Sequence, residues 1–363
     1  MRVLIVTVVH HPADARIAHR QIPALLAAGD QVTYAAPFTE RSSPPPPGVL
    51  PVDLPAARGR RRLMAVRAAR RLLAQRGDQD DVVLLHDPEL LWSVGRSRTP
   101  VIWDVHEDTA AALGMRSWLP SVLRPAARRA IARLERRAEQ RHSLLLAEES
   151  YQERFRLTHP VVPNTTWVPE TCPALTRPDQ VVHLGTLTSA RGVPALLQLA
   201  AGLRSAGLHL RLIGQAHGSA APEVGRAAAA GLLEWSGFLP NAEATAALDG
   251  ALAGVALLTD EPNYRHSRPT KILEYFAHGL PVVSTSLPCA DALLRDSGAG
   301  AVIDQGPPAQ VAAAALTILR EWRADLGLRD RLGMAGHRYA LAHHAWQRDG
   351  IAFVRAVHAA ARP

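Results

Sequence analysis

The stretch 263-NYRHSRPTKILEYFAHGLPVVST-285 contains Lys271, the single lysine of a chain of 363 residues. Lys and Arg together number 41, so the other basic residues are all arginines. A lone ammonium suggests a task that suits a compact point charge on a flexible stem, and binding phosphate is such a task. A codon bias toward arginine explains why lysine is scarce, but it does not explain where the remaining lysine lies.

The same stretch predicts a short helix followed by a buried strand, which is the repeating unit of a parallel α/β sheet. Pro269 suits the first turn of a helix, and Ser267 just upstream can cap it. The helical pattern continues through 270-TKILEYFAH-278 to Gly279, a residue that suits the C-terminal end of a helix. The apolar run 280-LPVVST-285 then predicts the strand.

Positive charge gathers at the start of this predicted helix. Arg265, Arg268 and Lys271 oppose the helix dipole there, because the free N–H groups of a helix N-terminus already attract anions. A bound diphosphate would make the arrangement favourable. Glu274 lies on the same face as Lys271 and could accept hydrogen bonds from ribose hydroxyls. The alternative is a simple surface pair between Lys271 and Glu274.

Length and composition predict two domains of a soluble globular protein. The chain is 47% hydrophobic and 20% charged, with a mean hydropathy of -0.03. Cys172 and Cys289 lack metal-binding spacing and favour a reducing cytoplasm. The opening run MRVLIVTVV predicts a first strand rather than a signal peptide. None of the apolar runs reaches the roughly 18 residues that span a bilayer.

Apolar runs alternate with helical patterns, which predicts two Rossmann-like parallel sheets whose domains face a cleft. The expected strands are 2–9, 31–37, 82–86, 100–106, 143–147, 181–186, 208–214, 233–238, 253–259 and 280–285. We expect an N-terminal domain over 1–162, a proline-rich linker over 163–178, a C-terminal domain over 179–340, and a helix over 341–363 that packs back on the N-terminal domain.

The net charge of +8 and the pI near 10.4 come largely from two arginine-rich helical segments, 58–76 and 124–141. Neither segment carries aromatic residues for base stacking, and no zinc or helix-turn-helix pattern accompanies them, so nucleic acid is not an expected partner. An anionic membrane surface, an anionic acceptor or a merely solvated arginine-rich face remain as alternatives.

Three pieces of the sequence together resemble glycosyltransferase family 4: the stretch 263–285, 86-HDPELL-91 and 103-WDVHED-108. Each occupies the position along the chain where the family carries it, and the resemblance covers nearly the whole chain. The family consists of retaining enzymes with the two-domain GT-B fold. The resemblance implies transfer of a hexosyl unit from a nucleoside diphosphate sugar to an acceptor hydroxyl, without a metal ion or another cofactor. A UDP-sugar is the first expectation for the donor, with GDP- or dTDP-sugars as alternatives.

The resemblance places the donor nucleotide in the C-terminal domain and the acceptor in the N-terminal domain. Lys271 and Arg265 would neutralise the phosphates. The residues implied in binding the nucleotide and its phosphates are Gly185, Thr186, Arg191, Thr270, Lys271 and Glu274. Arg191 stands where the family has lysine, and Thr186 stands where it often has arginine. One expected cation is therefore missing, and Arg265 or Arg268 would replace it.

The resemblance implies that His106 contacts the donor sugar near the reaction centre. His106 ends an expected strand, where an α/β sheet presents side chains to a ligand. His266 stands where the family often has an acid, which changes the sugar that is favoured. Each histidine also has an alternative role without a ligand. His106 could be a structural residue, and His266 could be an exposed loop residue. The residues implied on the acceptor side are Asp14, Arg16, His86, Asp87, Glu89 and Glu107. In the mechanism proposed for the family the departing phosphate takes the acceptor proton, so no protein nucleophile is expected.

Two other functions fit the same architecture: a nucleotide-sugar-binding protein without catalytic activity, and a nucleotide-sugar epimerase. Other chemistries lack their motifs. The first expected strand is not followed by G-x-G-x-x-G, and the chain has neither a P-loop nor a G-x-S-x-G elbow.

Overall fold

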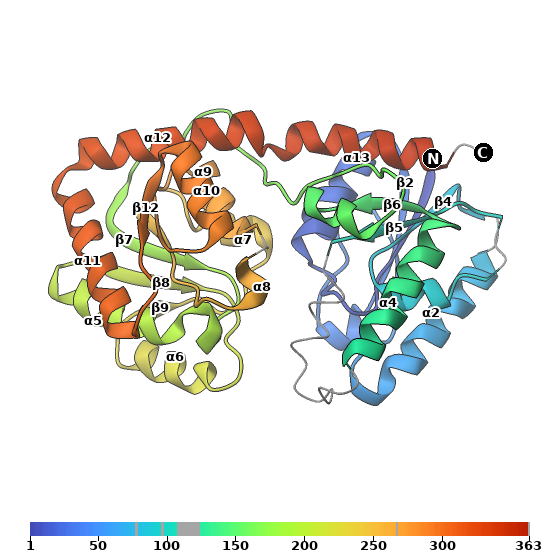
Figure 1. The fold of residues 1–363 in the computed structure, drawn as a ribbon, viewed down its shortest axis with the longest axis horizontal. Coiled ribbons are helices and arrows are strands. Elements are labelled where there is room, and N and C mark those ends of the chain that lie inside the picture. The colour runs from blue at the N-terminus through green and yellow to red at the C-terminus, as the bar shows by residue number, and fades with distance from the viewer. Residues whose placement is uncertain (77–78, 96–97, 107–123, 266–267, 362–363) are drawn as a thin grey trace. The chain divides into compact units, whose positions relative to one another are not determined.

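A computed structural model describes residues 1–76, 79–95, 98–106, 124–265 and 268–361. It divides the chain into two compact units, Met1–Asn164 with Gln347–Pro363 and Thr165–Trp346. Each unit is built on one six-stranded parallel sheet with helices packed around it (Figure 1). The sheets are buried on both faces, so their central strands are almost continuously apolar rather than alternating.

The sheet of the first unit has the strand order β3-β2-β1-β4-β5-β6. The strands are β1 Arg2–Val6, β2 Gln31–Ala36, β3 Leu50–Asp53, β4 Val82–Leu85, β5 Val101–Val105 and β6 Ser143–Leu146. The α- and π-helices are the π-helical η1 Ile17–Gln21, α1 Ile22–Ala27, α2 Arg62–Arg76, α4 Arg124–Glu139 and α13 Trp346–Ala360. Short 3-10 turns are η2 Thr39–Arg41, η3 Gly59–Arg61, η5 Pro88–Trp92 and η7 Glu149–Arg154.

The sheet of the second unit has the order β12-β11-β10-β7-β8-β9. The strands are β7 Arg177–Leu184, β8 His209–Ile213, β9 Glu234–Trp235, β10 Ala251–Ala256, β11 Val282–Thr285 and β12 Gly300–Ile303. The helices are η8 Ser189–Arg191, α5 Val193–Ser205, α6 Ala220–Ala229, α7 Asn241–Ala246, α8 Pro262–Arg265, α9 Thr270–Ala277, α10 Pro288–Ser297, α11 Pro308–Ala324 and α12 Leu326–His343.

All ten strands that the sequence predicts are present, although 233–238 shortens to Glu234–Trp235. Sequence reasoning missed β3 and β12, the strands at one edge of each sheet. Both are four residues long, and β3 has Pro51 and is largely exposed. Short edge strands carry little of the apolar signal by which buried strands are recognised.

The last helix packs within the first unit. His358 Nε2 of α13 lies 2.8 Å from Asp30 Oδ2, while Phe353 and Val357 of the same helix are fully buried. The second unit begins at Thr165, so most of the segment expected as a linker over 163–178 lies within that unit. The strand β7 already starts at Arg177, before the end of that segment.

None of the helices in the described ranges combines the length and apolarity needed to cross a bilayer.

Candidate functional site

Lys271 lies in the first turn of α9, which confirms the helix that the sequence predicts. The helix starts directly after Pro269 and ends at Ala277. Gly279, two residues later, has a left-handed φ of 66°. Lys271 is only 7% exposed, and its Nζ lies 3.3 Å from His183 Nε2 on β7. The only lysine of the chain therefore has its ammonium inside the second unit rather than on the surface.

His183 receives the hydrogen bond from Lys271. Its Nδ1 lies 3.1 Å from the carbonyl oxygen of Val255, so Nδ1–H must donate there and Nε2 is left as an acceptor. Burial, reinforced by the charge of Lys271, holds the pKa of His183 well below its ordinary value, so the ring is neutral. Sequence reasoning missed this residue, although a histidine within the apolar run 181-VVHLG-185 is itself a signal.

Burial lowers the pKa of Lys271 to about 7, with the nearby charge of Arg191 as the second cause. Glu274 acts in the opposite direction, but its charge does not offset the other two effects. Glu274 is itself buried, and its Oε1 accepts a weak hydrogen bond of 3.4 Å from Asn241 Nδ2. The positive charge of Lys271 is therefore not fully balanced by neighbouring groups, and a bound anion would favour the charged form of the side chain.

The backbone after β7 approaches Lys271 closely because it turns at a glycine. Gly185 has a φ of 117°, which side-chain-bearing residues rarely adopt, and a Cβ there would lie 3.6 Å from Lys271 Nζ. Gly214, with a φ of 144°, packs so closely that its Cβ would fall 2.1 Å from the Gly185 oxygen. The half-buried Thr186 continues this loop. Backbone and ammonium thus come together without a side chain between them.

A pocket of about 150 Å³ opens beside the start of α9 and is called the Lys271 pocket here. It is lined by Arg191, Leu258, Tyr264, Arg268, Pro269, Thr270, Lys271, Leu287 and Ala290. The guanidinium of Arg191 stacks 5.7 Å from the ring centre of Tyr264. Three lining residues are cationic and, among the described ones, none is acidic. Such a pocket suits a small polyanion.

Arg265 is a predicted phosphate contact that does not line the Lys271 pocket, and the lining also lacks the predicted contacts Gly185, Thr186 and Glu274. It is exposed, and its Nε donates to Asp260 Oδ1 at 2.6 Å. Arg268 lines the pocket instead, so it is placed to supply the cation that Thr186 does not provide. The predicted donor-sugar residue His266 and the predicted acceptor residue Glu107 lie outside the described residues.

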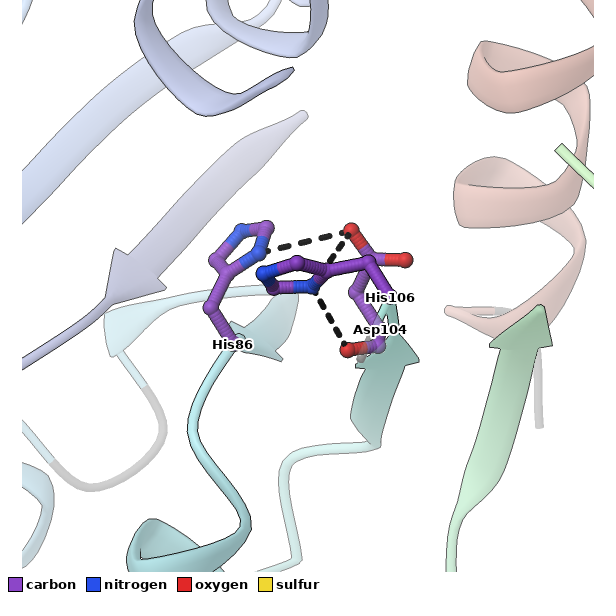
Figure 2. A group of neighbouring side chains, drawn as sticks. All are labelled: His86, Asp104 and His106. Carbon is purple, nitrogen blue, oxygen red and sulfur yellow. Dashed lines mark hydrogen bonds and ion pairs between the residues drawn. The ribbon is translucent and has the colours of Figure 1, made fainter. Parts of the chain in front are cut away.

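In the first unit, side chains at the ends of β4 and β5 form a second cluster. Figure 2 shows His86, Asp104 and His106 pointing toward one another. Asp104 Oδ2 lies 3.3 Å from His86 Nδ1, and His106 Nδ1 lies 3.1 Å from the backbone oxygen of Asp104. Asp104 is fully buried and accepts two hydrogen bonds of 2.7 Å from Arg16 and one of 2.6 Å from Gln21.

These contacts fix the charges of Asp104 and His106. Burial alone would raise the pKa of Asp104, but the charge and hydrogen bonds of Arg16 outweigh it and hold that pKa well below its usual range. Burial, followed by the charge of His10, lowers the pKa of His106 to about 3. The cluster therefore holds a carboxylate, a guanidinium and a neutral His106 imidazole, which can donate or accept a hydrogen bond.

The remaining predicted acceptor residues stabilise the loops around this cluster. Asp87 accepts hydrogen bonds of 3.1 Å from Thr7 Oγ1 and from the backbone N–H of Val9. Asp87 Oδ1 also lies 3.3 Å from His10 Nε2, and that nitrogen is 3.1 Å from His106 Nε2. His10 is a second residue that sequence reasoning missed, although it stands in the loop after the first predicted strand.

Asp14 and Glu89 have defined partners as well. Asp14 Oδ1 accepts from the backbone N–H of Arg16 at 2.9 Å and of Ile17 at 3.2 Å, which anchors the start of η1. Burial would raise the pKa of Asp14, but nearby His10 and the other histidines outweigh burial and lower it. Glu89 forms an ion pair with Arg62 of α2.

His86, Asp104 and His106 each offer a ligand atom, and these atoms lie within 4.8 Å of one another. That spacing would allow a metal ion, but Arg16 already occupies both oxygens of Asp104. A divalent cation would have to displace this guanidinium or sit beside it, and like charges make both arrangements costly. The residues therefore fit a hydrogen-bonded carboxylate better than a metal centre.

Residues 178–321 match the sequence model of the family described as Glycosyl transferases group 1. No curated protein sequence gives a significant match. The fold is similar to that of sucrose-phosphate synthase from Thermosynechococcus elongatus, with 16% identity, a TM-score of 0.71, and 98% and 97% of the two chains covered.

Two further solved structures are similar over almost their whole length. HepE from Anabaena, in complex with UDP and glucose, has 13% identity and a TM-score of 0.69, with 99% of this chain and 100% of that chain covered. AviGT4, a glycosyltransferase involved in avilamycin A biosynthesis, has 17% identity and a TM-score of 0.58, with 100% and 98% covered. The chain therefore has the α/β GT-B fold with two Rossmann-like units, and the segment that holds the Lys271 pocket matches Glycosyl transferases group 1.

Proposed function

We propose that this protein is a retaining glycosyltransferase that moves a hexosyl unit from a nucleoside diphosphate sugar to an acceptor hydroxyl. The observation that carries the proposal is the Lys271 pocket. It joins a desolvated ammonium, two guanidinium groups and the N-terminus of α9. The family match over residues 178–321 and the UDP and glucose in the HepE structure support a nucleotide-sugar donor, with a UDP-sugar as our first choice.

In this proposal the protein acts by stabilising the departing diphosphate. Negative charge develops on the leaving oxygen, and Lys271, Arg191 and the free N–H groups of α9 offset it without reorganising. The departing phosphate takes the proton of the acceptor hydroxyl, so a protein nucleophile is not required. Glu274 would bind the ribose, and the neutral imidazole of His106 would hydrogen-bond a sugar hydroxyl.

On the acceptor side we assign Asp14 and His86 to the surroundings of the acceptor hydroxyl, with Arg16 and Asp87 holding the adjacent loops in place. We also propose that the protein works in the cytoplasm, with the arginine-rich helices α2 and α4 turned toward an anionic membrane or acceptor.

The experiment that tests this function is a thermal-shift screen with UDP, GDP, dTDP and ADP, followed by calorimetry and a transfer assay with the matching sugars. A ligand that binds the folded state raises the melting temperature according to its affinity. We expect one nucleoside diphosphate to stand out. A flat response to all four would contradict the proposal. Binding without transfer or donor hydrolysis would identify a nucleotide-sugar-binding protein, and donor conversion without an acceptor would identify an epimerase.

The affinity for UDP should fall as the pH rises from 7 to 9. The pKa of Lys271 is about 7 in the free protein, so its ammonium is progressively lost above that pH. The terminal phosphate of UDP, with a second pKa of about 6, is already ionised there. We expect up to about a tenfold loss per pH unit, measured by calorimetry. In Lys271→Arg the charge persists, so the slope should disappear. A wild-type affinity that is independent of pH would contradict this role.

Replacing His183 by phenylalanine should lower the affinity for UDP by about five- to tenfold. The ring keeps a similar volume but lacks the nitrogen that accepts the hydrogen bond from Lys271. His183→Gln, which retains an acceptor, is the matched control and should recover part of the loss. The affinity is measured by calorimetry at a pH where each variant is folded. A UDP affinity equal to that of the wild type in both variants would show that His183 has no part in orienting Lys271.

A further inference from the structure

A groove of about 520 Å³ lies in the first unit between α4 and the segment around η5. Its apolar lining includes Leu91, Trp92, Val94, Leu134 and Ala138, and its basic lining consists of Arg133, Arg137, Arg141 and His142. None of these residues belongs to the His86–Asp104–His106 cluster or to the Lys271 pocket. The groove thus combines hydrocarbon walls with a row of cations, and the proposed sugar transfer does not use it.

The positive charge of the groove is uncompensated within the described part of the chain. Arg133 and Arg137 lie four residues apart on α4, which places like charges on one side of the helix and costs helix stability. Arg141 follows in the turn after the helix and lines the same groove. In the described ranges these three arginines have no ion-pair partner. An anion that lies against this stripe would relieve the repulsion between its charges.

The acids of α4 cannot neutralise this stripe because they are engaged elsewhere. Glu135 forms an ion pair with Arg154. Glu139 Oε1 accepts from the backbone N–H of Leu157 at 2.8 Å and lies 3.1 Å from His159 Nε2. Both glutamates are buried against the segment that follows β6, so the charge along the groove is net positive.

The apolar part of the groove is open to solvent. Trp92 is 69% exposed, which is unusual for the largest apolar side chain. Its segment η5 is held onto α2, where Ser93 Oγ donates to the backbone oxygen of Val66 at 3.0 Å. The helix α2 adds the exposed side chains of Leu63 and Met64, and further arginines, to the surface of this unit. Exposed tryptophan beside arginine is typical of surfaces that meet a membrane interface.

We propose that this groove binds an anionic phospholipid of a membrane, with the phosphate against Arg133, Arg137 and Arg141 and the first part of an acyl chain between Trp92 and Leu134. An amphiphile with one charged end satisfies both linings at once. An acidic peptide would satisfy the arginines but would leave the apolar walls uncovered. The arginines attract the anionic surface at long range, and the apolar walls contact the acyl chain once the lipid is bound. Both interactions hold the first unit at the membrane surface. This inference does not depend on the proposed sugar transfer.

The electrostatic part is tested by cosedimentation of the full chain with vesicles of phosphatidylcholine, with or without phosphatidylglycerol. We expect binding only to the vesicles that contain phosphatidylglycerol, and weaker binding at high salt. The triple variant R133Q/R137Q/R141Q should bind about 100-fold more weakly. The control R320Q/R323Q/R331Q changes three exposed arginines of α11 and α12 and should differ from wild type by less than about threefold. Equal binding to both kinds of vesicle, or equal losses in the two triple variants, would overturn the proposal.

The apolar part is tested by Trp92→Gln and Leu134→Gln in the same assay. Each should reduce binding to phosphatidylglycerol vesicles by about five- to tenfold, because each removes a wall of the groove. The control Met334→Gln, at an exposed position of α12, should bind like wild type. Thermal melts show whether each variant is folded. Trp92 is exposed, so Trp92→Gln should fold and still provides the test if Leu134→Gln unfolds. If the arginine variant loses vesicle binding but Trp92→Gln does not, the protein binds through surface charge alone, and the proposal of a lipid-binding groove is wrong.

Discussion

Replacing Lys271 by methionine is expected to weaken UDP binding by about 100-fold or more while making the folded protein more stable at neutral pH. The loss of affinity follows from removing a desolvated charge-assisted hydrogen bond, which is stronger inside a buried site than at a surface. Methionine keeps the unbranched shape of the side chain, so the packing around α9 is preserved. A change in UDP affinity of less than about threefold, measured by calorimetry, would contradict the role of this residue.

The gain in stability follows from the sign of the pKa shift. The pKa of Lys271 falls from 10.5 in the unfolded chain to about 7 in the folded protein. Between these values the unfolded chain binds more protons, so the free energy of unfolding rises with pH across that window. The burial penalty is fully present below pH 7. We therefore expect Lys271→Met to raise the free energy of unfolding by about 1–3 kcal/mol at pH 7 and by less at pH 10. Urea unfolding at both pH values measures this difference, with Lys271→Arg as the charged control.

Replacing Arg16 by methionine should cost about 3–5 kcal/mol of stability, because it leaves the fully buried carboxylate of Asp104 without a cation. The folded-state pKa of Asp104 is held below its unfolded value. Its ion pair therefore stabilises the protein above the unfolded pKa, and this contribution is lost as the pH falls through the folded pKa. In the variant Asp104 takes up a proton more easily, so the loss should be smaller at pH 4 than at pH 7.

The matched control for Arg16→Met is Arg2→Met. Arg2 Nη2 donates to Asp81 Oδ1 at 3.2 Å, and both side chains are exposed. Surface pairs of this kind contribute at most about 1 kcal/mol. Denaturant unfolding of both variants at the two pH values separates a buried ion pair from a surface one. Equal losses in the two variants would show that the Arg16–Asp104 pair does not stabilise the first unit.

The elements that the sequence predicts well are those marked by local signals. α9 begins after Pro269 and gives way to Gly279, and both limits are set by the backbone chemistry of single residues. The central strands are equally visible because burial on both faces makes them continuously apolar. The edge strands β3 and β12 lack that signal, because β3 contains Pro51 and is largely exposed and only the last residue of β12 is buried.

The partners of the site residues could not be predicted, because they are set by tertiary packing. Lys271 donates to His183, which lies 88 residues earlier in the chain, and Arg16 pairs with Asp104 at the same separation. The sequence pattern shows that residues 181–184 form a strand, but it does not show which imidazole nitrogen meets the ammonium. Arg265 is different, since its partner Asp260 is only five residues away and could have been noticed.

The most direct test of the Lys271 pocket is a crystal structure of the protein with UDP bound. We expect the diphosphate to lie within hydrogen-bonding distance, about 3 Å, of Lys271 Nζ and of the N–H groups at the start of α9. Gly185 should lie against the phosphates, with no side chain in between. A diphosphate bound elsewhere, with Lys271 still directed only at His183, would show that the Lys271 pocket is not the donor site.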